Sequence, residues 1–494
     1  MEREEVEISC SSCGEKSKRV GPLGTCLSCG GILTVEYPID DFSKIPAASL
    51  FEGNSIWRYS KLLPIETKDI PISLGEGGTA LLRARRLGEI LGMGKIFLKN
   101  ETTNPTGCFA DRGTAVEMTY ARDSGYRSVA CALSGNLAAS VAAYSARAGI
   151  DSLAFLPSNV DMGKLYQIVA YGAKIIPVSD QGEAESAMLQ LGEECHRITS
   201  QSPFFLEGIK TTGLEIAEQL EWRAPDRIVL SIGNGSHFTM IWKALKELEW
   251  LGLIDASETR MTGVQMAGWA HIVEAFSKKE SYTSDRKIHL AREIAVEHPQ
   301  MTDKAIQTIR ESDGTAIAVE EKEIIDAVQL LARAEGIFAE PAGAASIAGL
   351  RRLLEQGEID RGERVVCIIT GTGLKEPIAP LKMMQRFAGA RRISQRMERR
   401  IRMLDLGTTK ETIIGLLGRG SDYGYRIWKR LRDEKKINIT VVSVYQHLSE
   451  LEAADLVKKE RVERSPTRKT RVFYRLTARG EKFLTNEENE KKRF

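Results

Sequence analysis

The chain has 494 residues, with 42% hydrophobic and 28% charged side chains and a formal net charge of +2. This length exceeds what one hydrophobic core supports, so two or three globular domains are expected. No run of about 18 apolar residues is present, so no transmembrane helix is predicted. The acidic, polar start MEREEVEISC argues against a targeting peptide, and a cytoplasmic location is expected.

The first 40 residues carry two C-x-x-C pairs, Cys10 with Cys13 and Cys26 with Cys29, separated by twelve residues. Each pair is followed by a glycine that lets the backbone fold back, so four thiolates can face one centre. Four cysteines suit tetrahedral Zn²⁺ and leave no open position for a substrate. Two disulfides are the alternative, disfavoured in a cytoplasmic chain. We therefore predict a structural zinc ribbon over residues 1–40.

Residues 41–385 alternate short apolar runs with amphipathic helical stretches. The pattern indicates an α/β fold with buried parallel strands, whose carboxyl ends are the expected place for a ligand. Strands are predicted at 95–101, 128–134, 151–157, 173–179, 227–235, 261–268 and 364–373. Helices are predicted at 114–125, 136–149, 239–252 and 321–336.

The C-terminal part differs in charge from the rest. Residues 391–494 hold 27 Lys and Arg against 15 Asp and Glu, whereas the remainder holds 42 against 52. A basic helical connector is predicted at 386–406, followed by helices at 410–420, 422–436 and 440–457, two strands within 457–477 and a last helix at 478–494. Three helices and a basic hairpin over 407–494 indicate a winged helix-turn-helix, and the positive charge favours a polyanionic partner such as double-stranded DNA. A merely solvated helical surface is the alternative.

The stretch SIGNGSHF, residues 231–238, places glycines between a predicted strand and a predicted helix. Backbone amides and a helix N-terminus can cradle a phosphate there, although glycines also serve packing in such turns. Further motifs follow in order over about 300 residues, among them FLKNETTNPTGCFADRG, ALSGNLAAS, EGIKTTG, FAEPAGAAS and CIITGTGLKEP. Together they resemble threonine synthase and related pyridoxal-phosphate enzymes of the tryptophan-synthase β type.

That resemblance implies a two-lobed open-sheet α/β body (pyridoxal-phosphate fold type II) and a set of cofactor contacts. Gly233, Asn234, Gly235, Ser236 and His237 match the loop that holds the cofactor phosphate. Asn136 matches the residue that binds the pyridoxal hydroxyl, and Thr370 matches the hydroxyl that faces the pyridine nitrogen. The lysine that holds the cofactor covalently falls on Ala110.

A methyl group at position 110 cannot bind an aldehyde or shuttle a proton, so canonical catalysis is not expected. Neither Lys99 nor Lys210 is an evident substitute. Ser236 and His237 also depart from the family's loop, and Glu293, Glu297 and His298 stand where the enzymes have a glycine-rich pocket segment. A solvated helix face is the simpler interpretation of these three. Departures at several positions favour natural loss of activity over an engineered lysine replacement.

The segment 407–494 resembles the PadR-like winged-helix regulators, through IIGLLGRGSDYGYRIWKRL, SVYQHLSELEAADLV and TRVFYRLTARGEKFL. The resemblance implies a recognition helix near 440–455 in the DNA major groove and a wing on backbone phosphates. The candidate DNA contacts are Thr440, Ser443, Tyr445 and Gln446 on the helix, and Arg464, Arg468, Lys469 and Arg471 on the wing. Use of the winged helix for protein contacts is the alternative.

Two hypotheses follow. In the first, the chain is a DNA-binding transcriptional regulator whose catalytically inactive sensor binds pyridoxal phosphate without a covalent link, its amino-acid adduct or an amino acid. In the second, it is a threonine synthase or a related enzyme acting on a phosphorylated amino acid. A homodimer is expected in either case.

Overall fold

The computed structural model describes residues 7–16, 20–37, 51–65, 69–132, 135–157, 160–277, 291–376, 409–453, 455–464 and 470–491. The chain divides into two compact units, Met1–Pro380 and Leu381–Phe494. The basic connector predicted at 386–406 lies outside the described residues, and the predicted domain limits 1–40, 41–385 and 407–494 stay predictions. Among the described helices, none combines the length and apolar character that crossing a bilayer requires.

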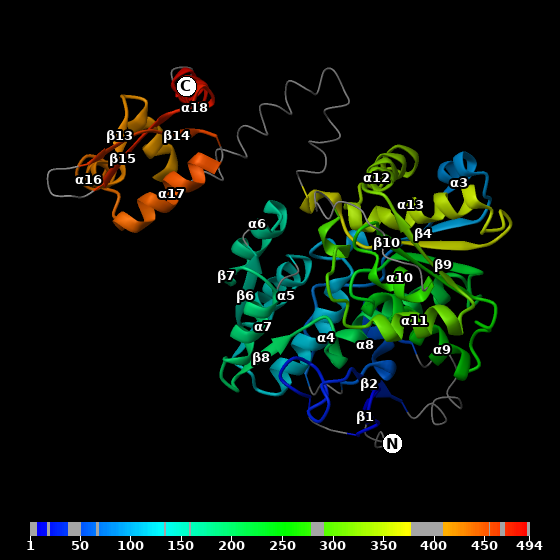
Figure 1. Cartoon of the computed structure of the whole chain (residues 1–494). Coiled ribbons are helices and arrows are strands. Elements are labelled where there is room, and N and C mark those ends of the chain that lie inside the picture. Colours follow the sequence, from blue (N-terminus) through cyan, green and yellow to red (C-terminus); the bar gives the residue numbers. More distant parts are fainter. Residues whose placement is uncertain are drawn as a thin grey trace. The chain divides into compact units, whose positions relative to one another are not determined.

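The first unit is built on two sheets, one in each lobe (Figure 1). The larger sheet has the order β11-β10-β9-β12-β4-β3 and the smaller has the order β7-β6-β5-β8. The larger sheet comprises β3 (Leu81–Arg83), β4 (Ile96–Asn100), β9 (Arg227–Ser231), β10 (Arg260–Met266), β11 (Thr315–Val319) and β12 (Val365–Ile369). The smaller comprises β5 (Ser128–Ala132), β6 (Asp151–Pro157), β7 (Lys174–Val178) and β8 (Cys195–Ile198).

Every strand predicted from the apolar runs is present, and β3, β8 and β11 are additional. The strand pairs are parallel except at one edge, where β3 runs antiparallel to β4. The short strand β3 is mostly exposed, so it lacks the continuous apolar run by which a buried parallel strand is detected.

Helices cover both sheets, as expected for an α/β body. They are α3 (Arg85–Leu91), α4 (Ala110–Asp123), α5 (Gly135–Ala148), α6 (Met162–Ala170), α7 (Gln181–Leu189), α8 (Pro203–Gln219), α9 (Ser236–Trp250), α10 (His271–Ser277), α11 (Thr302–Glu311), α12 (Glu321–Glu335) and α13 (Pro341–Gln356). Short 3-10 turns lie at η1 (Ile56–Leu62), η2 (Glu101–Thr103), η3 (Arg292–Ile294) and η4 (Gly373–Lys375). On the larger sheet, α13 packs close to Val264, whereas α9 packs on the opposite face beside the adjacent Gly263.

The two cysteine pairs lie beside a small antiparallel hairpin, β1 (Glu7–Cys10) and β2 (Leu33–Glu36). Its apolar side chains join the core of the body: Val35 and Tyr37 pack in one cluster with Leu62 and Leu214. The Tyr37 hydroxyl donates a hydrogen bond to Glu207 on α8 at 2.8 Å. The hairpin is therefore fixed to the first unit by buried contacts.

The second unit has the predicted winged-helix elements. Residues 409–417 are helical, and the elements after them are β13 (Asp422–Tyr423), α16 (Gly424–Asp433), α17 (Val441–Ala453), β14 (Val457–Arg464), β15 (Thr470–Leu476) and α18 (Ala478–Lys491). The strands form one antiparallel sheet in the order β13-β15-β14. A separate apolar core, which includes Ile414, Ile427, Leu448 and Tyr474, holds these elements together.

Candidate functional site

A cavity of about 260 Å³ lies at the carboxyl ends of the strands of the first unit. Its lining includes residues that follow β4, β8, β9 and β12, the start of α5 and residues within 293–300, at the edge where a ligand is expected in an open α/β fold. Backbone bridges join Cys108 to Gly371 and Ala339 to Thr372, so the loops after β4 and β12 and the start of α13 lie side by side. All the predicted cofactor residues line this one cavity: Asn136, Gly233, Asn234, Gly235, Ser236, His237 and Thr370.

The loop between β9 and α9 forms one wall. Gly235 has a φ of 98°, a conformation that glycine adopts without strain. Gly233 packs against a segment much later in the sequence. A Cβ atom at position 233 would stand 2.6 Å from the carbonyl oxygen of Glu293. The Asn234 side chain accepts a hydrogen bond from the backbone of Gln300 at 2.6 Å. Gly233 thus serves packing within the protein, whereas the N-terminus of the 15-residue helix α9 favours an anion.

His237 stands at the end of this wall, stacked on Phe109 with ring centroids 4.1 Å apart. Its Nε2 lies 3.0 Å from the Thr212 hydroxyl, and its Nδ1 has no hydrogen-bond partner among the described residues. Burial lowers the pKa of His237 to about 3, so the ring is neutral at physiological pH. An unsatisfied, buried ring nitrogen at a cavity wall fits a site that a polar ligand completes.

The opposite wall contains Ala110, the first residue of α4, which is 4% exposed and faces the cavity. The loop before it is rigidly held without any ligand. Asp111 accepts hydrogen bonds from the backbone and hydroxyl of Thr106, each at 2.7 Å, and from Ser140 at 2.6 Å. The Phe109 amide donates to the Thr370 carbonyl at 3.1 Å.

Arg112 holds α4 in place through buried ion pairs. Its guanidinium is fully buried and contacts Glu101 and Glu215, with nitrogen–oxygen distances of 2.7 Å to each. Burial alone would raise the pKa of Glu101, but the Arg112 charge holds it at about 2. Lys99 joins the same network through Glu215 at 2.6 Å. This lysine is therefore engaged in a buried network and does not line the cavity.

Lys210 does not line the cavity either. It is buried on α8, where its amine contacts Glu207 and lies 2.8 Å from Glu247. Among the described residues that line the cavity, none is a lysine or an arginine. The described cavity wall therefore offers no amine to an aldehyde.

Sequence reasoning named Glu293 but missed the charged side chains that surround it: Glu340, Lys164, Glu376 and Lys375. Glu340 and Glu293 line the cavity. The interpretation of Glu293, Glu297 and His298 as one solvated helix face was wrong, because only a short 3-10 turn forms here and Glu293 lies 2.7 Å from buried Lys164. Glu297 and His298 are both exposed, as expected, and His298 also lines the cavity. The signal available in the sequence was the replacement of a glycine-rich segment by acidic residues.

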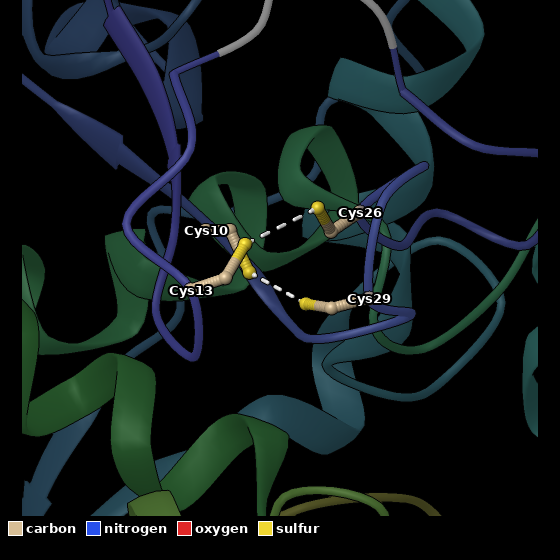
Figure 2. Close-up of side chains that lie close together, drawn as sticks. All are labelled: Cys10, Cys13, Cys26 and Cys29. Carbon is tan, nitrogen blue, oxygen red and sulfur yellow. Dashed lines mark hydrogen bonds between the residues drawn. The ribbon is translucent and has the colours of Figure 1, made fainter.

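The four cysteines form the second candidate site, shown in Figure 2. Their sulfur atoms all lie within 4.8 Å of one another, with Cys10 and Cys29 3.5 Å apart and Cys13 and Cys26 3.8 Å apart. A tetrahedron with metal–sulfur bonds of about 2.3 Å has sulfur–sulfur edges of about 3.8 Å. All are free thiols. This arrangement fits a tetrahedral ion such as Zn²⁺ and could hold one.

Thiolate formation is already favoured at Cys10. Burial acts to raise its pKa, but hydrogen bonds from the backbone of Cys13 and Ser12 outweigh burial and lower the pKa to about 6. At Cys29 the Gly31 amide acts in the same direction, yet the neighbouring Cys13 and Cys10 sulfurs raise its pKa to about 12. Four clustered thiolates therefore require a cation between them.

The predicted DNA contacts lie on α17 and the hairpin of the second unit. Tyr445 and Gln446 are exposed on α17, whereas Val444, Leu448 and Leu451 are buried beneath them. The Thr440 hydroxyl accepts a hydrogen bond from the Ser443 amide at 3.1 Å and lies 2.8 Å from its hydroxyl, which gives both residues a part in starting the helix. Arg471 is exposed on β15 and lies over the Tyr423 ring. Arg464 ends β14, its side chain lies outside the described part of the chain, and so do Arg468 and Lys469.

Comparison with known proteins agrees with this architecture. Residues 72–371 match the model of the pyridoxal-phosphate dependent enzymes, and residues 413–486 match the transcriptional regulator PadR-like family. Solved structures with the same fold include maize serine racemase (TM-score 0.53, 20% identity, covering 63% of this chain and 93% of that one) and the processed form of threonine deaminase isoform 2 from Solanum lycopersicum (TM-score 0.52, 22% identity, covering 63% and 83%). The first unit thus has the fold of a pyridoxal-phosphate enzyme.

Relatives with higher sequence identity define the family within the pyridoxal-phosphate dependent enzymes. Threonine synthase from Methanocaldococcus jannaschii is 43% identical over 381 residues, which cover 76% of this chain and 94% of that protein. Threonine synthase from Methanosarcina acetivorans is 42% identical over 377 residues, 75% of this chain and 92% of that protein. The chain therefore belongs to the threonine synthase family of pyridoxal-phosphate dependent enzymes and carries a PadR-like domain at its C-terminal end.

Proposed function

We propose that this chain is a DNA-binding transcriptional regulator whose sensor is a threonine synthase-like body without catalytic activity. In this proposal the body binds a small molecule of the pyridoxal-phosphate or amino-acid type, and the winged helix binds double-stranded DNA. Zn²⁺ at the four cysteines has a structural part. The observation that carries the proposal is Ala110, a methyl group on the cavity wall at the position of the family's lysine.

The cavity supports ligand binding without catalysis. The glycine wall and the unsatisfied Nδ1 of His237 fit the phosphate of pyridoxal phosphate, and Asn136 and Thr370 fit contacts to its ring. When bound in an enzyme, this cofactor serves as an electron sink for a substrate amine held on it. Here the residues bind and orient a ligand, but none of the lining residues described offers the amine that exchange requires.

The PadR-like domain supports DNA as the partner. The basic balance of residues 391–494 favours phosphate contacts, and exposed Tyr445 and Gln446 lie on the helix that the family likeness assigns to the major groove. We further propose a homodimer, because two winged helices at a fixed spacing read two half-sites. Ligand binding would then act on DNA affinity through that spacing.

Fluorescence anisotropy tests this proposal with the full chain and a DNA duplex taken from the region upstream of its own gene. We expect binding that prefers this duplex over a scrambled one, weakens steeply with salt and shifts when pyridoxal phosphate is added. Binding that ignores sequence, or that no cofactor-type ligand alters, would contradict the regulator.

One observation favours an enzyme instead. Lys375 lies just behind the cavity wall, with its amine 2.9 Å from Asn136 Oδ1 and 3.5 Å from Cys108 Sγ. A modest movement would bring this amine towards the place that position 110 leaves empty. Borohydride reduction of the full chain mixed with pyridoxal phosphate, followed by peptide mass spectrometry, decides between the two functions. A covalent pyridoxyl group on Lys375 would support the enzyme, and an unmodified chain supports the sensor.

A further inference from the structure

The cavity is electrically asymmetric. Its glycine wall offers backbone amides and a helix N-terminus to an anion. The same lining contains Glu340, which is 2% exposed at the start of α13 and accepts both Asn136 Nδ2 contacts, at 3.1 and 3.2 Å. Glu293 adds a second carboxylate to the cavity lining. The lining therefore holds groups that fit an anion and groups that fit a cation.

Carboxylates outnumber cations among the described side chains around Glu340 and Glu293. Lys164 Nζ lies 2.7 Å from Glu293, 2.9 Å from Glu376 and 3.3 Å from Asp161, so one ammonium serves three carboxylates. Lys375 donates a hydrogen bond to Asn136, which in turn donates to Glu340. The described cluster thus has two cations for four carboxylates, those of Asp161, Glu293, Glu340 and Glu376.

Keeping Glu340 ionised at this buried place is energetically costly unless a cation lies beside it. Burial, with the neighbouring Glu293 charge, raises the pKa of Glu340 against the attraction of Lys164. Burial also raises the pKa of Glu376, to about 7. A ligand cation next to Glu340 and Glu293 would lower the cost of keeping them ionised.

Two observations independent of the carboxylates also point to a ligand. His237 lines the cavity, is more than nine-tenths buried and keeps Nδ1 without a partner among the described residues. Ala110 leaves open the space that an enzyme of this family fills with its lysine side chain. A ligand that carries its own amine can fill that space and place the amine near Asn136 and Glu340.

We propose that the sensor takes a phosphate monoester that bears a primary ammonium group, of the kind represented by the amine form of the cofactor, pyridoxamine 5′-phosphate. The phosphate lies on the glycine wall, and the ammonium lies against Glu340 and Glu293. In this proposal the absence of a lysine at position 110 contributes to ligand specificity. Without an amine there, the chain cannot bind the aldehyde form of the ligand covalently and therefore does not prefer it over the amine form. This inference rests on the sensor function proposed above.

Isothermal titration calorimetry of the full chain tests the inference with two ligands that differ at one group. Pyridoxamine 5′-phosphate carries an ammonium where pyridoxine 5′-phosphate carries a neutral hydroxyl. We expect the amine to bind at least tenfold more tightly than the alcohol, and pyridoxamine without phosphate to bind weakly. Equal affinities for the amine and the alcohol, or tighter binding of pyridoxal 5′-phosphate than of the amine, would overturn the inference and leave the sensor function intact.

Carboxylate variants locate the preference. Glu340→Gln and Glu293→Gln should each reduce the amine-to-alcohol ratio of affinities at least threefold while the alcohol still binds. Exposed Glu358→Gln is the matched control and should keep the ratio. If Glu340→Gln fails to fold, partly exposed Glu293→Gln still gives the answer. An unchanged ratio in folded variants contradicts the assigned ammonium position, and failure of every cofactor form to bind contradicts the sensor itself.

Discussion

The two walls of the cavity differ in what they retain from a pyridoxal-phosphate enzyme. The wall between β9 and α9 has a glycine turn at Gly235 and the helix N-terminus that favours an anion. The wall at the start of α4 has the turn, the aspartate and the arginine of an active-site loop, but a methyl group at Ala110. Binding and covalent chemistry are thus assigned to different side chains, so one can be lost while the other remains.

The largest expected effect comes from returning an amine to the second wall. Ala110→Lys should give a covalent link to pyridoxal phosphate where the wild-type chain gives none, because the side chain would enter the cavity directly. Borohydride reduction and peptide mass spectrometry would detect the pyridoxyl group at residue 110. Ala110→Met, of similar length without an amine, is the control. Modification of the wild-type chain to the same extent would contradict the expectation that it has no amine at this wall.

Damage to the first wall should weaken the binding of phosphorylated ligands. In Gly233→Ala, the new methyl group would stand 2.6 Å from the Glu293 carbonyl oxygen, and the backbone must move. We expect a loss of about 3 kcal/mol in binding of phosphorylated ligands, or about 100-fold. Gly94→Ala, at a glycine with open space around it, should bind as the wild type does. Calorimetry with pyridoxal phosphate compares them, and full affinity in Gly233→Ala would argue against a phosphate at this wall.

A smaller effect separates ligand binding from DNA binding. Gln446→Ala removes an exposed amide from α17 and should weaken DNA binding by about 1–3 kcal/mol if the amide reads a base. Cofactor affinity should not change, since the cavity lies in the other unit. Ser449→Ala, also exposed and one turn further on, is the control in anisotropy titrations. Equal DNA affinities for both variants would remove Gln446 from the interface.

The smallest effect concerns pH. Burial raises the pKa of Glu376 from 4.5 to about 7, so the folded chain binds a proton there more tightly than the unfolded chain does. The contribution of Glu376 to the free energy of unfolding is therefore highest below pH 4.5 and falls as the pH rises to about 7. In Glu376→Gln this fall should shrink, because an amide does not take up the proton.

Urea unfolding at pH 5 and pH 8 measures that difference. Glu358→Gln, an exposed carboxylate, should leave the wild-type pH dependence unchanged. If Glu376→Gln had the same pH dependence as the wild type, an ionised Glu376 would carry no free-energy cost in the folded chain.

Much of this architecture was predictable because the strands of the body are buried on both faces and therefore read as apolar runs. β9 and β12 are examples, with every residue buried. β3 was missed because its exposed residues carry no such signal. In the second unit, alternation in the hairpin and the basic composition predicted the winged helix, and the helices at 409–417, α16 and α17 confirm it.

The phosphate wall was predictable for a local reason, whereas the acidic wall was not. Gly233 to His237 are contiguous, so a motif reveals them. Glu340, Glu293 and Lys164 are far apart in sequence, and folding alone brings them together. His237 was expected as a cofactor contact, but its stacking on Phe109 and its neutral ring depend on burial that no sequence pattern reports.

The buried Arg112 network has a consequence for how such a chain can change over generations. Arg112, Glu101 and Glu215 hold the loop in place, and Asp111 ties it to Ser140, all without a contribution from residue 110. Removing a lysine at that position deletes a reactive group and leaves the supporting bonds in place. The conformation of this loop therefore does not depend on which side chain stands at position 110, so that position is open to change while the surrounding structure is kept.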